Sequence, residues 1–295
     1  MIINTDKVIE IFCTTDDFCK QIKTPMNQHL LSVPSPQSVK VPAISESEMI
    51  TLLILYHHSG YKCFKYYYKE TVLKELQSYF PKAPCYARFV ALIPRTFLHL
   101  FVMVNTFVTG RKVHLYYADS KQLPVCHNRR IYSHKVFSGL AQRAKSSTGW
   151  FYGFKLFLVV NPMGEIIRAL TVPANIADNN ENMLVKLFKG FYGKAFADRG
   201  FITQKGFAKL FSAGLKLITG IRRNMKNKLM DMQEKLLLKK RGMIESINDI
   251  LMTICDIDHT RHRSPVNAFT HLYAGLAAYS FLERKPSVLN KKFVK

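Results

Sequence analysis

Three acidic side chains stand in basic or apolar surroundings that are unusual for charged groups. Asp119 follows Tyr-Tyr-Ala, Asp198 lies within Phe-Ala-Asp-Arg-Gly, and Glu245 follows Arg-Gly-Met-Ile. Hard divalent cations such as Mg²⁺ prefer carboxylate oxygens and commonly bind through one or two carboxylates together with substrate phosphates. The three acids therefore predict a metal site for Mg²⁺, or for Mn²⁺ in its place.

The chemistry that such a site favours is phosphoryl transfer. Two ions roughly 3.5 to 4 Å apart can activate an attacking oxygen and stabilise the leaving oxygen of an in-line displacement. We predict that Asp119 is the ligand shared by two ions, and that Asp198 and Glu245 each complete one side. These three acids are the candidate catalytic residues.

Each acid by itself also has a structural interpretation. An aspartate at the end of a strand, such as Asp198, can cap a following helix. Arg241 and Glu245 are four residues apart on one helical face, and a surface ion pair between them would contribute about 0.3 to 0.5 kcal/mol. The catalytic interpretation accounts for the three acids as a group.

The charge of the chain points to a polyanionic partner. The 295 residues contain 43 Lys and Arg against 20 Asp and Glu, a net charge of +23. Residues 1–110 hold 11 basic against 8 acidic residues, whereas residues 111–295 hold 32 against 12. Such a field attracts nucleic acid or an anionic membrane. We expect DNA and no membrane, because Arg88, Pro94 and Arg95 interrupt the apolar stretch 86–108.

Basic residues cluster where this DNA would lie. No acid occurs between Ser120 and Gly164, and eight Lys and Arg stand between positions 222 and 241. Further lysines lie just before and within one predicted helix of the N-terminal region. The candidate DNA contacts are Lys62, Lys65, Lys69, Arg129, Arg130, Lys155, Arg222, Arg223, Lys240 and Arg241.

The cysteines and the first residues indicate the compartment. None of the six cysteines forms a Cys-x-x-Cys pair, which is typical of reduced thiols. The segment Met-Ile-Ile-Asn-Thr-Asp lacks the positive and apolar regions of a signal peptide. We expect a cytoplasmic protein.

The first 110 residues have helical patterns throughout. Ser45 and Glu48 form a capping-box signature ahead of an apolar run, and Gly60 breaks this helix before a basic helix over 64–80. The pair predicts a helix-turn-helix that places its second helix in a DNA groove. An ordinary helical hairpin with solvated lysines is the equal alternative.

Residues 111–295 change to strands. Strands are expected over 113–118, 150–160, 165–172, just before Asp198, and over 215–221, with helices between the later strands and a long final helix through Glu245. This order predicts an α/β fold with a mixed sheet and flanking helices, of the ribonuclease-H-like kind. We therefore divide the chain into a helical DNA-binding region, 1–110, and a catalytic domain, 111–295.

The chain resembles bacterial insertion-sequence transposases of the DDE type, and most closely the insertion-sequence 982 family. The resemblance rests on six ordered segments: Asp119–Pro124, Ser147–Lys155, Ala197–Phe201, Arg222–Met230, Arg241–Asp249 and His262–Asn267. It implies a ribonuclease-H-like core with Asp119, Asp198 and Glu245 as the triad. Relatives often have an acidic pair near positions 178 and 179, where this chain keeps only Asp178.

The resemblance also implies what the protein acts on. The N-terminal region would recognise terminal inverted repeats, and the metal site would hydrolyse the transposon ends before the freed 3'-hydroxyl attacks target DNA. Synapsis of two ends makes a homodimer the expected assembly. Two alternatives stay open: a nuclease of the same fold without strand transfer, and an inactive transposase-derived DNA-binding protein.

The basic runs lead to a prediction about salt. If they contact about six phosphates, the logarithm of the DNA-binding constant falls with the logarithm of salt concentration at a slope near −5, because each contact releases counterions. Fluorescence anisotropy of a labelled duplex at several salt concentrations measures this slope. A slope near zero would remove the argument for a polyanionic partner.

Overall fold

The computed structural model describes residues 4–30, 43–146, 149–220, 230–258 and 262–288, and the chain forms two compact units. The first unit combines residues 1–107 with 251–281, and the second combines 108–250 with 282–295. Arg222 and Arg223, two of the predicted DNA contacts, lie outside the described residues.

The described part of the first unit is helical, as predicted for the N-terminal region. Its helical elements are α1 (Thr5–Leu30), α2 (Glu46–Ser59), α3 (Phe64–Tyr67), η1 (Tyr68–Glu75), α4 (Tyr86–Leu92), η2 (Ile93–Thr96), α5 (Phe97–Thr106) and α10 (Pro265–Ser280). The predicted capping box forms at Ser45 and Glu48, and Gly60 adopts the left-handed conformation that ends α2. The two helical segments of the predicted helix-turn-helix are therefore present, and its docking on DNA stays a prediction.

Helix α10 differs from the sequence-based division, which placed residues 111–295 in one domain. It packs against α2 and α5 of the first unit. Every residue of α10 from Thr270 to Tyr279 is buried. A helix that is apolar on all sides must be covered by other helices, so this late segment joins the N-terminal helices.

One helical stretch of the described chain, Tyr86–Thr106, is long and apolar enough to cross a membrane by length and composition. The sequence predicts that Arg88, Pro94 and Arg95 exclude a membrane span in this stretch. A buried core helix meets the same criterion, and the absence of a membrane partner stays an expectation.

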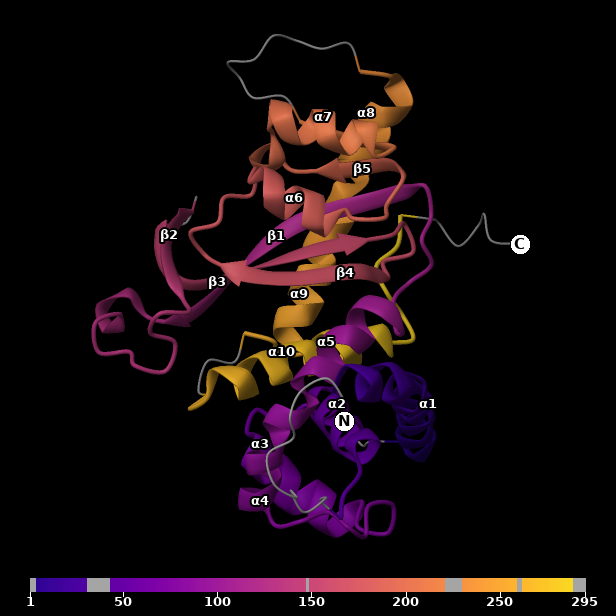
Figure 1. The fold of residues 1–295 in the computed structure, drawn as a ribbon, viewed down its shortest axis with the longest axis vertical. Coiled ribbons are helices and arrows are strands. Elements are labelled where there is room, and N and C mark those ends of the chain that lie inside the picture. The colour runs from indigo at the N-terminus through magenta and orange to yellow at the C-terminus, as the bar shows by residue number, and fades with distance from the viewer. Residues whose placement is uncertain (1–3, 31–42, 147–148, 221–229, 259–261, 289–295) are drawn as a thin grey trace. The chain divides into compact units, whose positions relative to one another are not determined.

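The second unit is built on one mixed sheet (Figure 1). Its strands are β1 (Leu115–Cys126), β2 (Gln142–Ser146), β3 (Gly149–Val160), β4 (Ile166–Pro173), β5 (Gly193–Ala197) and β6 (Leu215–Thr219). Neighbouring strands follow the order β2-β3-β1-β5-β6, and β4 pairs with β3 as well. β3 is antiparallel to β1 and β4, whereas β5 and β6 continue the sheet in parallel with β1. The predicted α/β class, a mixed sheet with flanking helices after a helical N-terminal region, is confirmed.

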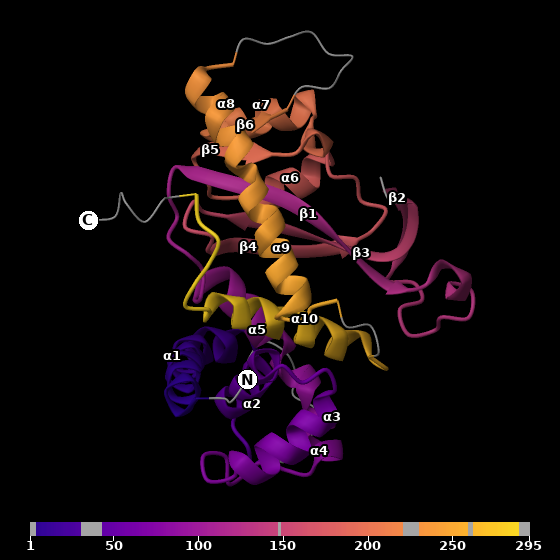
Figure 2. The ribbon, with the colours of Figure 1, turned by 180° about the vertical axis from the view of Figure 1, so that it is seen from behind.

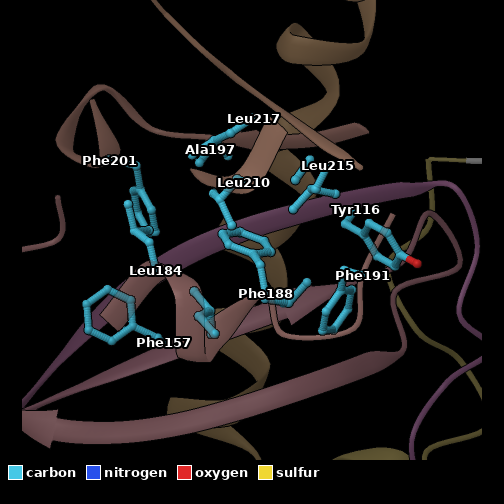
Figure 3. Close-up of a cluster of buried hydrophobic side chains, with 14 of the residues drawn as sticks. Tyr116, Phe157, Leu184, Phe188, Phe191, Ala197, Phe201, Leu210, Leu215 and Leu217 are labelled. Atoms are coloured by element: carbon cyan, nitrogen blue, oxygen red, sulfur yellow. The ribbon is translucent and has the colours of Figure 1, made fainter. Parts of the chain in front are cut away.

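One face of this sheet carries the core of the unit. Helices α6 (Glu181–Leu187) and α7 (Gln204–Ser212) cover it, and their Leu184 and Leu210 belong to one buried cluster with Tyr116 and Phe157 of the sheet (Figure 3). Because side chains alternate along a strand, Tyr116, Ala118 and Ser120 of β1 point to this face, and Tyr117 and Asp119 point to the other.

The other face is crossed by α9 (Met243–Thr253), which follows α8 (Met232–Lys239) and the short turn η5 (Lys240–Gly242) (Figure 2). Glu234 holds α8 to the sheet. Its buried carboxylate accepts from Lys194 of β5 at 2.8 Å and from Lys216 of β6 at 2.7 Å. These two ion pairs fix the helical segment that leads into Arg241 and Glu245.

The strand that carries Asp119 is longer than predicted. Asp119 was expected at its end, but β1 continues to Cys126 and pairs with β3 along that length. The polar run after Asp119 and the proline at 124 look like a loop in sequence. Because β5 ends at Ala197, this part of β1 pairs on one side only, and Pro124 loses no sheet hydrogen bond on the open side.

Candidate active site

The parallel pairing of β1 with β5 brings the first two acids together. Tyr117 lies opposite Phe196, and their rings are 5.7 Å apart, so two residues further Asp119 lies level with Asp198. β5 ends at Ala197, which leaves Asp198 just beyond the strand with 57% of its side chain exposed. Both acids therefore point to the sheet face that α9 crosses.

The third acid comes from α9. Arg241 and Glu245 lie one helical turn apart, and the guanidinium contacts the Glu245 carboxylate at 3.2 Å. The same guanidinium lies 3.7 Å from an Asp119 oxygen and 3.9 Å from an Asp198 oxygen. All three predicted acids thus converge on one arginine. The proposed surface ion pair forms, but it is one part of a four-residue cluster.

Burial makes Asp119 electrostatically different from its neighbours. Burial raises the pKa of Asp119 to about 6, and the Arg241 guanidinium and the Ser120 backbone amide partly oppose this shift. Only 19% of the Asp119 side chain is exposed, against 65% for Glu245. A nearby cation is needed to keep this carboxylate ionised, and Arg241 provides that charge here.

Asn248 is a site residue that the sequence analysis missed. Its side-chain amide donates a hydrogen bond of 3.0 Å to Asp119, and only 5% of the residue is exposed. Its carbonyl oxygen is buried without a partner among the described residues. Its position three residues after Glu245 puts it on the same helical face, which is the signal that would have identified it.

The donor chemistry of the cluster suits a hard divalent cation, but the acids do not form a ready-made cage. Among the described ranges, no three Asp, Glu, His or Cys side chains are grouped closely enough to hold a metal ion as they stand. The positive charge between the carboxylates belongs to Arg241. The cluster fits a cation if the guanidinium gives way, since all three carboxylates already lie within 4 Å of it.

Asp178 does not belong to this cluster. It accepts hydrogen bonds from Ser120 at 3.0 Å and from Lys155 at 2.8 Å. Ser120 lies next to Asp119 in β1 and so points to the opposite face of the sheet. Asp178 therefore ties the segment before α6 to β1 and β3. Lys155, predicted to contact DNA, is 15% exposed and engaged in this pair.

The other predicted DNA contacts are distributed over both units. In the first unit, Lys65 and Lys69 are exposed, and Lys62 forms an ion pair of 2.9 Å with Asp256. In the second unit, Arg129, Arg130 and Lys240 are exposed. Of the predicted DNA contacts that the structure describes, Arg241 is the one that lies at the three acids.

Comparison with known proteins gives two similarities. A family model described as a transposase DDE domain matches residues 109–265, more than half of the chain. The fold is similar to that of the piggyBac transposase in a synaptic complex with hairpin DNA, with a TM-score of 0.49 and 11% identity over 94% of this chain and 72% of that chain. Among curated proteins, none matches this sequence.

The buried charge of Asp119 leads to a stability prediction. Its folded pKa of about 6 lies above the ordinary value of 3.8, so ionisation destabilises the fold above pH 6 and has no effect below pH 4. In metal-free buffer, Asp119→Asn should raise the free energy of unfolding at pH 8 by up to about 3 kcal/mol. The gain should decline between pH 6 and pH 4.

Denaturant unfolding with a chelator at pH 8 and at pH 4 measures this effect. Glu245→Gln is the control, because Glu245 is mostly exposed and the substitution should change stability by less than about 0.5 kcal/mol. A loss of stability for Asp119→Asn at pH 8 would contradict the argument.

Proposed function

The chain belongs to the transposase DDE domain family, and from this premise we propose that it is an insertion-sequence transposase that cuts DNA at transposon ends and joins them to target DNA. The observation that carries this proposal is the convergence of Asp119, Asp198 and Glu245 around Arg241, within 4 Å of its guanidinium. Three acids gathered on one face of a strongly basic unit suit chemistry on a polyanion.

We assign the catalytic triad to these three acids. Asp119, Asp198 and Glu245 would hold two Mg²⁺ ions, or Mn²⁺, which when bound supply activation of the attacking oxygen and stabilisation of the leaving one. Asn248 orients the Asp119 carboxylate through its 3.0 Å hydrogen bond. A hydrogen bond of this kind holds the carboxylate in one orientation toward the metal ion, as residues around metal ligands commonly do.

Arg241 has a second task once cations neutralise the acids. Its guanidinium would then no longer need to balance their charge, and it would lie next to DNA bound at the three acids, because it is within 4 Å of each of them. An arginine fork matches two phosphate oxygens at once, so Arg241 would grip the DNA backbone. Lys240, exposed next to it, would add a further phosphate contact.

The wider assignment follows the same premise. The protein would belong to the insertion-sequence 982 group and act in the cytoplasm, on the nucleoid. The helical first unit would recognise terminal inverted repeats through α3 and η1, where Lys65 and Lys69 are exposed. Two copies would bind two ends as a homodimer during synapsis.

Two alternatives share parts of this proposal. A nuclease of the same fold would cut DNA with the same triad and would not join the ends. A DNA-binding descendant without activity would need no acids at the site, whereas here Asp119 keeps a buried charge that costs stability. A strand-transfer assay separates the first alternative, and any cleavage at all excludes the second.

The test is cleavage of a labelled duplex taken from the DNA that flanks the coding segment. With Mg²⁺ or Mn²⁺, the purified protein should nick it at the transposon end. Asp119→Asn, Asp198→Asn and Glu245→Gln should each reduce nicking to the level seen with a chelator, and binding of the end should persist. Full activity in any one variant would remove that residue from the triad.

The role of Asn248 makes a separate prediction. Asn248→Ala should lower activity, or raise the Mg²⁺ concentration for half-maximal cleavage, by about 10- to 100-fold, because Asp119 loses its orienting donor. A Mg²⁺ titration of the cleavage rate measures it. Ser246→Ala, an exposed change on the same helix, should leave the titration unchanged. Equal titrations for both variants would make Asn248 a packing residue only.

A further inference from the structure

The second unit has a projection that the proposed chemistry does not use. We call residues 123–146 and 149–153 the arm. It comprises the end of β1, the turn η3 (Asn128–Arg130), β2 and the start of β3. Figures 1 and 2 show β2 and the adjoining segment extending away from the rest of the sheet of this unit.

The arm has a core of its own and is therefore a built structure. Phe137 is 3% exposed and packs on Phe154, with ring centroids 5.7 Å apart. His134 stacks on Phe137 in a nearly parallel arrangement, and the Tyr152 hydroxyl donates to the Phe137 carbonyl at 3.3 Å. These contacts fix the segment after η3 on β3, so the surface of the arm is held in place.

That surface combines positive charge with exposed aromatic rings. Trp150, the single tryptophan of the chain, is 51% exposed, and the guanidinium of Arg143 lies over its ring at 4.9 Å from the centroid. Tyr132 is 94% exposed. The sequence from Ser120 to Gly164 contains no acid, so the arm carries Arg129, Arg130, Lys135, Arg143 and Lys145 with no opposing carboxylate of its own.

The arm shares a sheet face with the three acids. In β3, Leu158 lies opposite Asp119, and Trp150 lies eight residues earlier, so both point to the same face of the strand. Lys145 is the direct partner of Trp150 in β2. The path along β3 measures at most about 27 Å, the length of roughly eight stacked nucleotides. Leu158, Leu156 and Phe154 of this face are buried, so DNA bound at the acids would reach Trp150 by passing over the side chains that cover them.

We propose that the arm binds an unpaired nucleotide of the DNA by stacking its base on Trp150, while the neighbouring basic residues hold the adjacent phosphates. The proposal rests on the proposed function in taking DNA as the partner. Every base has a flat face that stacks on an aromatic ring, which makes such a contact independent of sequence. Arg143 adds a cation next to the ring and within reach of the backbone.

A paired duplex does not explain the exposed indole. Basic side chains are sufficient to bind the phosphates of a duplex, without an aromatic ring. The bases of an intact duplex are already stacked on one another. A large exposed aromatic ring contributes to DNA binding when an unpaired base can stack on it. Under the proposed function, strand separation at a cut transposon end would supply such a base.

The single tryptophan allows a direct measurement. With a chelator present, so that no cleavage occurs, the emission of the full-length protein is followed during titration with three probes: a short oligo(dT) strand, a fully paired duplex of equal length, and the same duplex with one unpaired thymidine. We expect Trp150 emission to be quenched by the strand and by the duplex with the unpaired base, and to change little with the paired duplex.

Variants test the same contact by anisotropy of labelled probes. Trp150→Ala should weaken binding of the strand and of the unpaired-base duplex about ten-fold or more, and change paired-duplex binding less than about two-fold. Trp150→Phe, which keeps a ring, should recover most of the affinity. Phe211→Ala is the matched control, because Phe211 is a 71% exposed aromatic of the same unit outside the arm.

Each other outcome has a defined meaning. Equal weakening of all three probes by Trp150→Ala would overturn stacking and leave only a duplex contact. Unchanged binding of all probes, or loss of self-association with unchanged DNA binding, would overturn the arm as a DNA site. Absence of any salt-dependent DNA binding by the unaltered protein would instead refute the proposed function, so the two failures can be told apart.

Discussion

The register between β1 and β5 is the constraint on which the site depends. Tyr117 lies opposite Phe196, and the acids two residues further along both strands therefore share one sheet face. A shift of one residue would turn Asp119 toward the apolar core under α6 and α7, where a carboxylate has no partner. The large aromatic side chains beside the acids thus secure the register as well as the core.

Gathering acids on one face creates a charge problem that the fold solves with its own cation. Burial disfavours the ionised form of Asp119. The Arg241 guanidinium lies within 4 Å of Asp119 and also of Asp198 and Glu245. Glu234 fixes the position of α8, because its ion pairs with Lys194 and Lys216 hold this helix on β5 and β6. The short turn η5 after α8 therefore places Arg241, and α9 with Glu245, next to Asp119 and Asp198.

Much of the fold was predictable from local patterns. The hairpin of β3 and β4, the strand before Asp198 and the helical N-terminal region all follow from alternation, turn residues and capping signals. The extension of β1 past Asp119 and the strand β2 were missed, because the polar residues of the arm have no alternating pattern. The place of α10 with the first unit depends on packing partners that lie far away in sequence.

The sequence by itself determined which groups can do chemistry: three acids in a basic chain, each at the edge of an element, with an arginine one turn before Glu245. Only the tertiary structure decided how they meet. Asn248 and Asp119 are 129 positions apart and become hydrogen-bonded neighbours, whereas Asp178 and Lys155 fall on the opposite face. Alternation along a strand assigns the face, but the distance between elements arises when the sheet register and the helix packing form together.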